Sequence, residues 1–159
     1  MRKKLLLMGL LLTLCTVGCG KMEYPELPDN PIAFTMGEFE DPEHDQEGFL
    51  TIEYNGRTYI PYGVPKNFTF GTKSLDKCIG YIMQDENVTN MPDPDYKSER
   101  VYTVNGDEDN NFLMEYDDTS ELMTPPPIFY RAIDTQGKDI SIPKFIDASG
   151  HEFWEEPME

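Results

Sequence analysis

Oxygen-bearing side chains are concentrated in residues 105–111, which read Asn-Gly-Asp-Glu-Asp-Asn-Asn. Asp107, Asp109 and Asn111 alternate along this segment with the spacing of the first calcium ligands of an EF-hand loop. The sixth position of such a loop would be Phe112, where the sharp turn requires glycine, and the sequence indicates no flanking helices. These three residues are therefore weak calcium candidates, and a solvated hairpin loop is the simpler interpretation.

Residues that could act as a nucleophile and its base are few. The histidines are His44 and His151, and a Cys78–His151 pair could work on paper because a thiolate needs a base nearby. Cys78 lies in an apolar run, however, where a small buried thiol is the ordinary explanation. Zinc would need more His and Cys ligands than the chain offers. We therefore predict no catalytic residues, no metal centre and no non-covalent cofactor, and we expect the chain not to be an enzyme.

The clearest structural element is FLTIEYNGRTYIPYG, residues 49–63. Asn55-Gly56 predicts a two-residue type I′ hairpin turn, because both central positions of that turn need a positive φ. Pairing outward from the turn gives one face that we expect to be the core side, with the pairs Tyr54/Arg57, Ile52/Tyr59 and Leu50/Pro61.

The opposite face of the hairpin is polar near the turn and apolar at its open end. The apolar end carries Phe49, Ile60 and Tyr62. Packing beneath other strands is the favoured interpretation, since aromatic side chains in strands usually pack. The alternative is an exposed patch through which the domain contacts a partner.

Further strands are predicted at residues 80–84, 100–104, 111–116 and 127–133, and a turn at 134–137 leads to another at 140–142. A helical spacing also fits part of this region, through Leu75, Cys78, Ile79, Ile82 and Met83. We predict one helical turn behind Ser74, followed by the strand at 80–84. The fold class is mainly β, either all-β or α+β: a small antiparallel barrel, sandwich or sheet with minor helix.

The first eighteen residues have the layout of a secretory signal peptide. Arg2, Lys3 and Lys4 are basic, residues 5–17 are nearly all apolar, and residues 16–19 are small. The apolar run is too short for a membrane-spanning helix, which needs about 20 apolar residues. Residues 1–18 are therefore predicted to be removed in the mature protein.

The end of this leader resembles the cleavage box of bacterial lipoprotein precursors, which reads roughly Leu, a small residue, Gly or Ala, then Cys. Val17, Gly18 and Cys19 match, while Thr16 stands where Leu is preferred. The resemblance implies cleavage after Gly18 and a diacylglycerol on the Cys19 thiol, with acyl chains that hold the protein on a membrane. An ordinary secretory signal with an incidental cysteine is the alternative. The resemblance covers only the leader and assigns no function to the remainder.

The charge and the cysteine count of the chain argue against some partners and against a disulfide. The chain has a net charge of −17, and loss of Arg2, Lys3 and Lys4 with the leader would bring it to −20. Such a charge argues against nucleic acid and against electrostatic attachment to anionic lipid. Cys78 would be the one thiol left after processing and lipidation, so the mature domain must be held together by its core and not by a disulfide.

Residues 19–47 differ in character from the rest of the chain. Four prolines alternate there with nine acidic residues, a composition that predicts an extended tether able to lift a domain several tens of ångströms from a bilayer. A single mainly β domain is then predicted over residues 48–159. An early strand that docks on the domain is also compatible with the sequence, in which case the domain starts near residue 31. The residues in question are Ile32, Ala33, Phe34 and Phe39.

These patterns lead to one functional hypothesis and two alternatives. The hypothesis is a lipid-anchored protein on the extracytoplasmic face of a bacterial membrane, whose domain binds an unidentified protein or small molecule. The alternatives are a substrate-capturing accessory of a transporter and an envelope enzyme with an unrecognised site. Aromatic side chains converging on a ligand would favour a small molecule, a flat patch around Phe49, Ile60 and Tyr62 would favour a protein, and clustered acids with perturbed pKa values would favour an enzyme.

Overall fold

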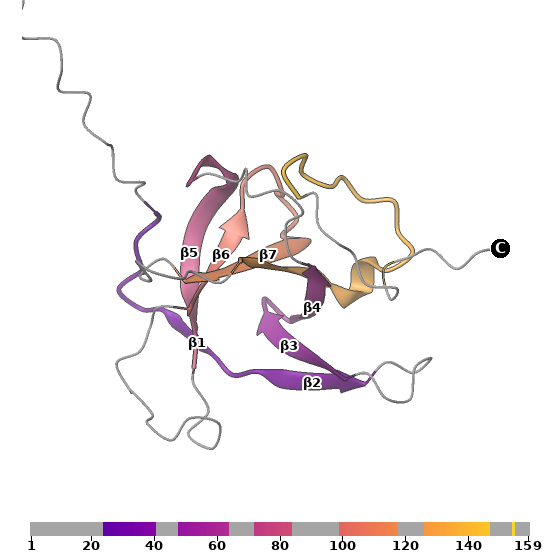
Figure 1. The fold of residues 1–159 in the computed structure, drawn as a ribbon, viewed down its shortest axis with the longest axis horizontal. Helices are drawn as coiled ribbons and strands as arrows, with labels where there is room; N and C mark the ends of the chain where they lie inside the picture. Colours follow the sequence, from indigo (N-terminus) through magenta and orange to yellow (C-terminus); the bar gives the residue numbers. More distant parts are fainter. Residues whose placement is uncertain are drawn as a thin grey trace, which may run out of the picture.

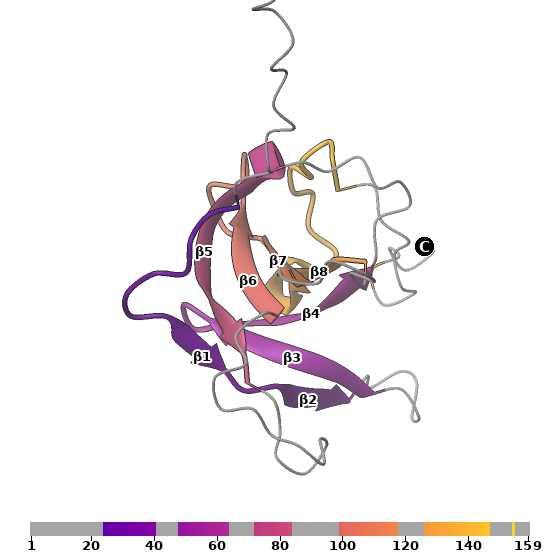
Figure 2. The same ribbon diagram turned by 60° about the vertical axis from the view of Figure 1, so that its left-hand side comes forward.

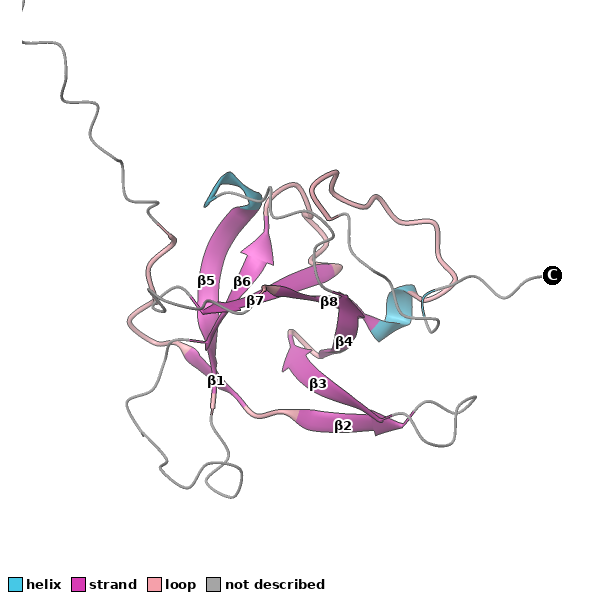
Figure 3. Ribbon diagram, in the orientation of Figure 1, coloured by secondary structure: helices cyan, strands magenta, loops and turns pink. Residues whose placement is uncertain are grey.

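The computed structural model describes residues 24–40, 48–63, 72–83, 99–117, 126–146 and 154. Regular structure in these ranges consists of strands and two short 3₁₀ helices, η1 (Thr72–Ser74) and η2 (Ile133–Thr135) (Figures 1 and 3). The strands are β1 (Ile32–Phe34), β2 (Gly37–Glu40), β3 (Gly48–Tyr54), β4 (Arg57–Gly63), β5 (Leu75–Ile82), β6 (Glu99–Val104), β7 (Phe112–Asp117) and β8 (Ile128–Ala132). The predicted mainly β fold is confirmed. No helix in the described ranges is long and apolar enough to cross a membrane.

The strands form one curled sheet in the order β1-β5-β6-β7-β8-β4-β3-β2. Neighbours are antiparallel except β1 and β5, which run parallel, so the sheet is mixed. The two edge strands, β1 and β2, are consecutive in the chain and are separated only by Thr35 and Met36. One continuous segment therefore carries both edges of the sheet, which curls into the half-barrel seen in Figure 2.

The hairpin of β3 and β4 forms around the predicted turn. Asn55 and Gly56 have φ values of 51° and 73°, as a type I′ turn requires. The predicted register is confirmed for Ile52–Tyr59, Glu53–Thr58 and Tyr54–Arg57, and Ile52 and Tyr59 are fully buried. Away from the turn the core-face prediction is wrong for one residue.

That residue is Leu50, whose surface is 53% exposed. Between Gly48 and Thr51 strand β3 pairs with the edge strand β2, and Leu50 lies opposite Glu38. A residue this close to the sheet edge has no strand to cover it, although its side chain follows the same alternation as Ile52.

Alternation along the strands gives the sheet two apolar faces. One cluster takes its members from the edge strand β1 and from β3 to β8 of the curled sheet, so it fills the concave side: Phe34, Ile52, Tyr59, Ile82, Val101, Leu113, Tyr130 and Ala132. The other lies over β5 to β8 on the convex side: Leu75, Cys78, Tyr102, Val104, Phe112, Met114, Phe129 and Ile146. Segments outside the sheet cover the convex cluster through Tyr24, Leu27, Ile140 and Phe145.

The segment predicted to be a tether belongs to the domain wherever it is described. β1 pairs with β5, β2 pairs with β3, and Phe34 is buried on the concave side. Before β1, the hydroxyl of Tyr24 donates to that of Tyr116 over 3.2 Å. The domain therefore starts by residue 24, earlier than residue 48 or residue 31, because apolar side chains between the prolines bury themselves against the sheet. Residues 41–47, which include His44, lie outside the described residues.

Strand β5 is longer than predicted: it begins at Leu75, so the helical turn expected behind Ser74 does not form, and the 3₁₀ helix η1 ends at Ser74. The register with β6 shifts between Leu75 and Cys78 and again between Cys78 and Gly80. Such irregularities break the two-residue alternation of a strand, which explains why the buried residues Leu75 and Cys78 are three residues apart, a spacing also found in helices. The strand predicted at residues 140–142 does not form, and Ile140 instead packs against the convex cluster.

Candidate functional site

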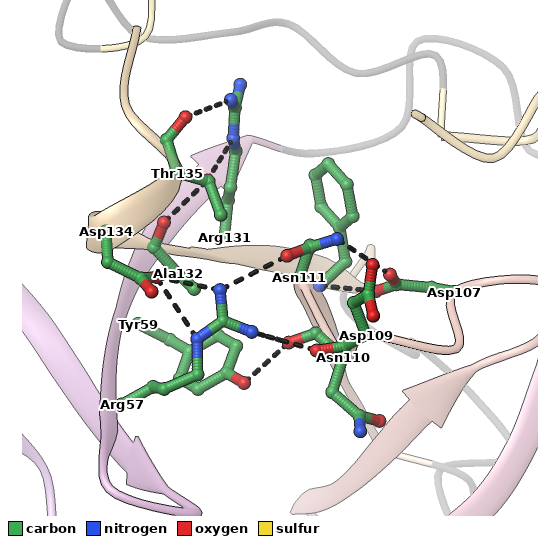
Figure 4. A network of polar contacts seen from close by, with 11 residues as sticks. Arg57, Tyr59, Asp107, Asp109, Asn110, Asn111, Arg131, Ala132, Asp134 and Thr135 are labelled. Atoms are coloured by element: carbon green, nitrogen blue, oxygen red, sulfur yellow. Dashed lines mark hydrogen bonds and ion pairs between the residues drawn. The ribbon is translucent and has the colours of Figure 1, made fainter. Parts of the chain in front are cut away.

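Arg57 joins three parts of the fold at one end of the sheet (Figure 4). It is the first residue of β4, directly after the hairpin turn. Its Nη1 donates to the carbonyl oxygens of Asp109 (2.9 Å) and Asn110 (3.0 Å), and its Nη2 donates to Oδ1 of Asn111 (3.1 Å). Oδ1 of Asp134, in η2, accepts from both Nε (3.1 Å) and Nη2 (2.7 Å). Arg57 thus fastens the hairpin to the β6–β7 loop and to η2.

The pKa values of two groups beside Arg57, the Asp134 carboxyl and the Tyr59 hydroxyl, are shifted. The hydrogen bonds from Arg57 hold the pKa of the Asp134 carboxyl below its ordinary value. Burial raises the pKa of the Tyr59 hydroxyl to about 12, so the hydroxyl stays protonated at neutral pH. It donates to the carbonyl oxygen of Asn110 over 2.6 Å, which adds a second link to the β6–β7 loop.

The calcium candidates lie in this loop, and the structure gives their oxygens internal partners. The carboxylate of Asp107 accepts from the backbone N–H of Phe112 (2.6 Å) and from Nδ2 of Asn111 (3.3 Å). Asn111 Oδ1 and the backbone carbonyl of Asp109 both accept from Arg57. Across the described ranges no group of three or more His, Cys, Asp or Glu residues could hold a metal ion. Three oxygens of the loop, the carbonyls of Asp109 and Asn110 and Oδ1 of Asn111, accept instead from the guanidinium of Arg57.

A second arginine, Arg131 of β8, lies on the convex face and is only 7% exposed. Its Cζ is 4.7 Å from the ring centroid of Trp154, 5.8 Å from that of Tyr62 and 5.9 Å from that of Phe112. Nε donates to Oγ1 of Thr135 and Nη2 donates to the carbonyl oxygen of Thr135, each over 2.8 Å. We call these five residues the Arg131 box.

The rings of the Arg131 box are held in place by one another and by the backbone. Tyr62 meets Phe112 edge-on at 5.4 Å between centroids and meets Trp154 edge-on at 5.9 Å. Nε1 of Trp154 donates to the carbonyl oxygen of Pro61 over 2.9 Å. In the register, Arg131 pairs with Phe112 of β7 on one side and with Ile60 of β4 on the other. The box is therefore built on the middle of the sheet.

Arg131 has no carboxylate partner among the residues that the structure describes. Burial lowers the pKa of its guanidinium, yet arginine remains charged in proteins. A cation over an aromatic ring is stabilised by about 0.5–2 kcal/mol, which offsets part of the cost of burying the charge. The box therefore holds a positive charge that is balanced by rings and by one threonine.

Acidic side chains gather at the opposite end of β6 and β7. Glu99 lies opposite Asp117 in the register, and the hydroxyl of Tyr130 donates to Oε2 of Glu115 over 2.6 Å. Burial raises the pKa of the Glu115 carboxyl, and the neighbouring Glu99 raises it further. Burial also raises the pKa of Glu99, with a contribution from Asp117. Glu99 and Glu115 therefore keep their protons to a higher pH than they would in water.

The exposed patch proposed for Phe49, Ile60 and Tyr62 does not form. Ile60 is fully buried, and Tyr62 belongs to the Arg131 box. Phe49 is partly buried, and its ring stacks on that of Phe39 with centroids 6.5 Å apart. The alternative interpretation, packing against other parts of the fold, is confirmed for Ile60 and Tyr62.

The predicted burial of Cys78 is confirmed, since it is 6% exposed within the convex cluster. Its Sγ lies 3.6 Å from the carbonyl oxygen of Gly80, at hydrogen-bonding distance for a thiol. Its proposed partner His151 and the lipid-attachment candidate Cys19 lie outside the described residues.

The Arg131 box was not predicted from the sequence, because its members come from β4, β7, β8, η2 and the C-terminal part of the chain. The available signal was weak: an arginine inside an otherwise apolar strand, and the single tryptophan of the chain. A scan against protein-family models finds no match for this chain, and searches of curated proteins and of solved structures find none either.

Proposed function

We propose that this chain is a lipid-anchored protein of the bacterial envelope whose β domain binds a small ligand without catalysing a reaction. The Arg131 box is the observation that carries the binding part of this proposal. It combines aromatic rings with a buried charged donor on a rigid sheet, which is the usual composition of a small-ligand site. Ligand capture of this kind would also suit an accessory of a transporter.

The anchor part of the proposal is supported by the sequence of the leader. A basic start, a short apolar run and Val17-Gly18-Cys19 follow the pattern of lipoprotein precursors. The net charge of −17 would repel anionic headgroups, so attachment to a membrane needs a lipid and cannot depend on basic side chains.

Two observations bear on catalysis. A nucleophile must be reached by its substrate, and Cys78 is buried in the convex cluster. Neighbouring carboxyl groups with raised pKa values, as at Glu99 and Glu115, are the feature that would favour an enzyme. Glu115, however, shares the face of β7 that carries Leu113 of the concave core, and it already binds the Tyr130 hydroxyl. We therefore assign this acidic cluster to the packing of the domain and not to catalysis.

The anchor is tested by mass spectrometry of the mature N-terminus and by membrane fractionation of a Cys19→Ser variant. We expect an acylated Cys19 in the native protein, and release from the membrane or blocked maturation in the variant. An unmodified start, or cleavage at another position, would remove the anchor from the proposal.

Binding is tested by purifying the full chain from its native envelope and identifying small molecules that are released on denaturation. We expect a compound that co-purifies with the wild-type chain in stoichiometric amount and is depleted in an Arg131→Gln variant. A compound recovered equally from both chains would show that the Arg131 box is not the binding site.

A further inference from the structure

Arg57 and Arg131 differ in burial and in hydrogen-bond partners, and the more exposed of the two has more partners. Arg57, whose side chain is 24% exposed, bonds to a carboxylate and to three further oxygen atoms. Arg131 is 7% exposed and bonds to Thr135 alone. Buried charges in proteins are normally paired and hydrogen-bonded, whereas exposed ones need no partner. The more buried guanidinium is the one that requires an explanation.

The contacts within the Arg131 box leave donors of the guanidinium unused. Nη1 of Arg131 donates to no acceptor in the described part of the chain. The faces of the three rings attract the positive charge but do not replace an oxygen acceptor for each N–H. An unsatisfied buried donor is rare in native proteins and is often explained by a bound ion, water or ligand.

The acidic composition of the chain makes this lack of a partner more informative. The chain has 30 Asp and Glu residues, so carboxylates that could pair with a purely structural arginine are abundant. Arg57 has one and Arg131 has none among the described residues. An internal carboxylate would occupy the donors that an external anion needs.

From these observations we propose that the Arg131 box binds a small oxyanion, a carboxylate or phosphate group of a ligand, through the unused donors of Arg131. This inference rests on the proposed binding function and names the chemical class of the ligand. A planar guanidinium matches both groups because it can donate two parallel hydrogen bonds to their oxygens. The adjoining rings of Tyr62, Phe112 and Trp154 would contact the apolar part of the same ligand.

Trp154 gives this proposal a direct assay, because it is the only tryptophan in the chain and lies 4.7 Å from the Arg131 guanidinium. We would titrate the full chain with sodium acetate and, separately, with sodium phosphate, and keep the ionic strength constant with sodium chloride. Constant ionic strength matters because the acidic chain repels anions at long range. We expect a saturable change in Trp154 emission with acetate, with phosphate or with both, and none with chloride. Saturation by one salt alone identifies the group that is recognised.

Three variants locate the response. Arg131→Gln should abolish saturation, and Arg131→Lys, which keeps the charge but loses the planar pair of donors, should weaken binding about 10- to 100-fold. Arg57→Gln is the matched control: it removes an arginine that lies outside the Arg131 box and should leave the dissociation constant unchanged. Equal binding by wild type and Arg131→Gln would overturn the proposal.

A measurement on the wild-type chain covers the case in which the Arg131 variants do not fold. A bound anion stabilises the folded state by mass action, so the melting temperature should rise with acetate or phosphate above its value in equimolar chloride. Absence of both this rise and the saturable fluorescence change would refute the oxyanion inference. If a neutral compound is recovered from the native chain while neither anion binds, the inference fails and the proposed binding function remains.

Discussion

Replacement of Gly80 by alanine should separate β1 from the sheet. Gly80 lies opposite Ile32 in the parallel pairing of β1 and β5. A Cβ at Gly80 would overlap the carbonyl oxygen of Ile32, and would lie 2.8 Å from both Ile32 C and Phe34 Cε2. Contacts below 3.0 Å are essentially never made by real Cβ atoms. Since two of the three obstructing atoms belong to the backbone, a side-chain rotation cannot relieve the overlap and β1 itself must move.

The cost has two parts. Overpacking of a well-packed site destabilises proteins by about 1–3 kcal/mol. If β1 lifts away, Phe34 also leaves the concave core, where it is 3% exposed, and burial of a phenylalanine contributes about 1.5–3 kcal/mol. We therefore expect Gly80→Ala to lower the free energy of unfolding by about 3 kcal/mol, a large share of the ~5–15 kcal/mol typical of a domain.

Two other glycines of the same sheet provide graded controls. At Gly48 the nearest atom to an added Cβ is the carbonyl oxygen of Phe39, at an ordinary 3.9 Å, so Gly48→Ala should change the stability by less than about 0.5 kcal/mol. At Gly37 the obstacle is Oγ1 of Thr51 at 2.5 Å, the end of a side chain that can rotate, so Gly37→Ala should fall in between. Any entropic gain from Gly→Ala in the unfolded chain is common to all three variants and cancels in the comparison.

Urea unfolding followed by far-UV circular dichroism gives the three free energies. A Gly80→Ala variant whose unfolding free energy lies within about 0.5 kcal/mol of Gly48→Ala would mean that β1 does not pair with β5 in this register. A smaller slope of free energy against urea for Gly80→Ala alone would instead indicate that β1 undocks before the rest of the domain unfolds.

Three further predictions concern other parts of the domain. Gly56→Val should lower the thermal midpoint by an amount equivalent to at least ~1 kcal/mol, because a β-branched residue is strained at a φ of 73°, and an unchanged midpoint would contradict the turn. Cys78 should react slowly with a water-soluble thiol reagent in the folded chain and quickly in denaturant, as read by peptide mass spectrometry, and fast native labelling would disprove its burial. Burial holds the pKa of Glu115 above its ordinary value, so its ionisation opposes folding: stability is fully present below the ordinary pKa and is lost as the pH rises through the raised one. Glu115→Gln, which can still accept from Tyr130, should reduce this loss in urea unfolding as the pH rises above the ordinary pKa of about 4.3, and a pH dependence equal to that of the wild type would refute the raised pKa.

Local patterns in the sequence predicted local structure well. Asn55-Gly56 determines its turn through backbone conformation alone, and the register next to it follows from the turn. Strands β6, β7 and β8 begin and end within one residue of the predicted bounds because alternation and turn residues delimit them. Where β5 departs from regular pairing, the same reasoning mistook a strand with shifted register for a helical turn.

Features that depend on distant segments could not be predicted in this way. The predicted strand at residues 80–84 starts at Gly80, but its role appears only in the fold: its lack of a side chain makes room for the backbone of β1, which lies far earlier in the chain. For the oxygen-rich loop at residues 105–111 the sequence favoured a solvated hairpin loop, with calcium as a weak alternative. The contact with Arg57 follows only from the fold that brings β4 beside the loop.

The early start of the folded chain sets how far the domain could stand from a membrane. Tyr24, which packs against the convex cluster, is five residues beyond Cys19, and an extended chain covers at most ~3.6 Å per residue. A lipid on Cys19 would therefore confine the domain to within ~18 Å of the headgroups, about two Debye lengths at physiological ionic strength. Charges more than one Debye length apart are largely screened, so anionic headgroups would repel only the acidic parts of the domain that come within ~8 Å of the surface, and this would bias its orientation. The domain would meet only those ligands that come within this short reach of the bilayer surface.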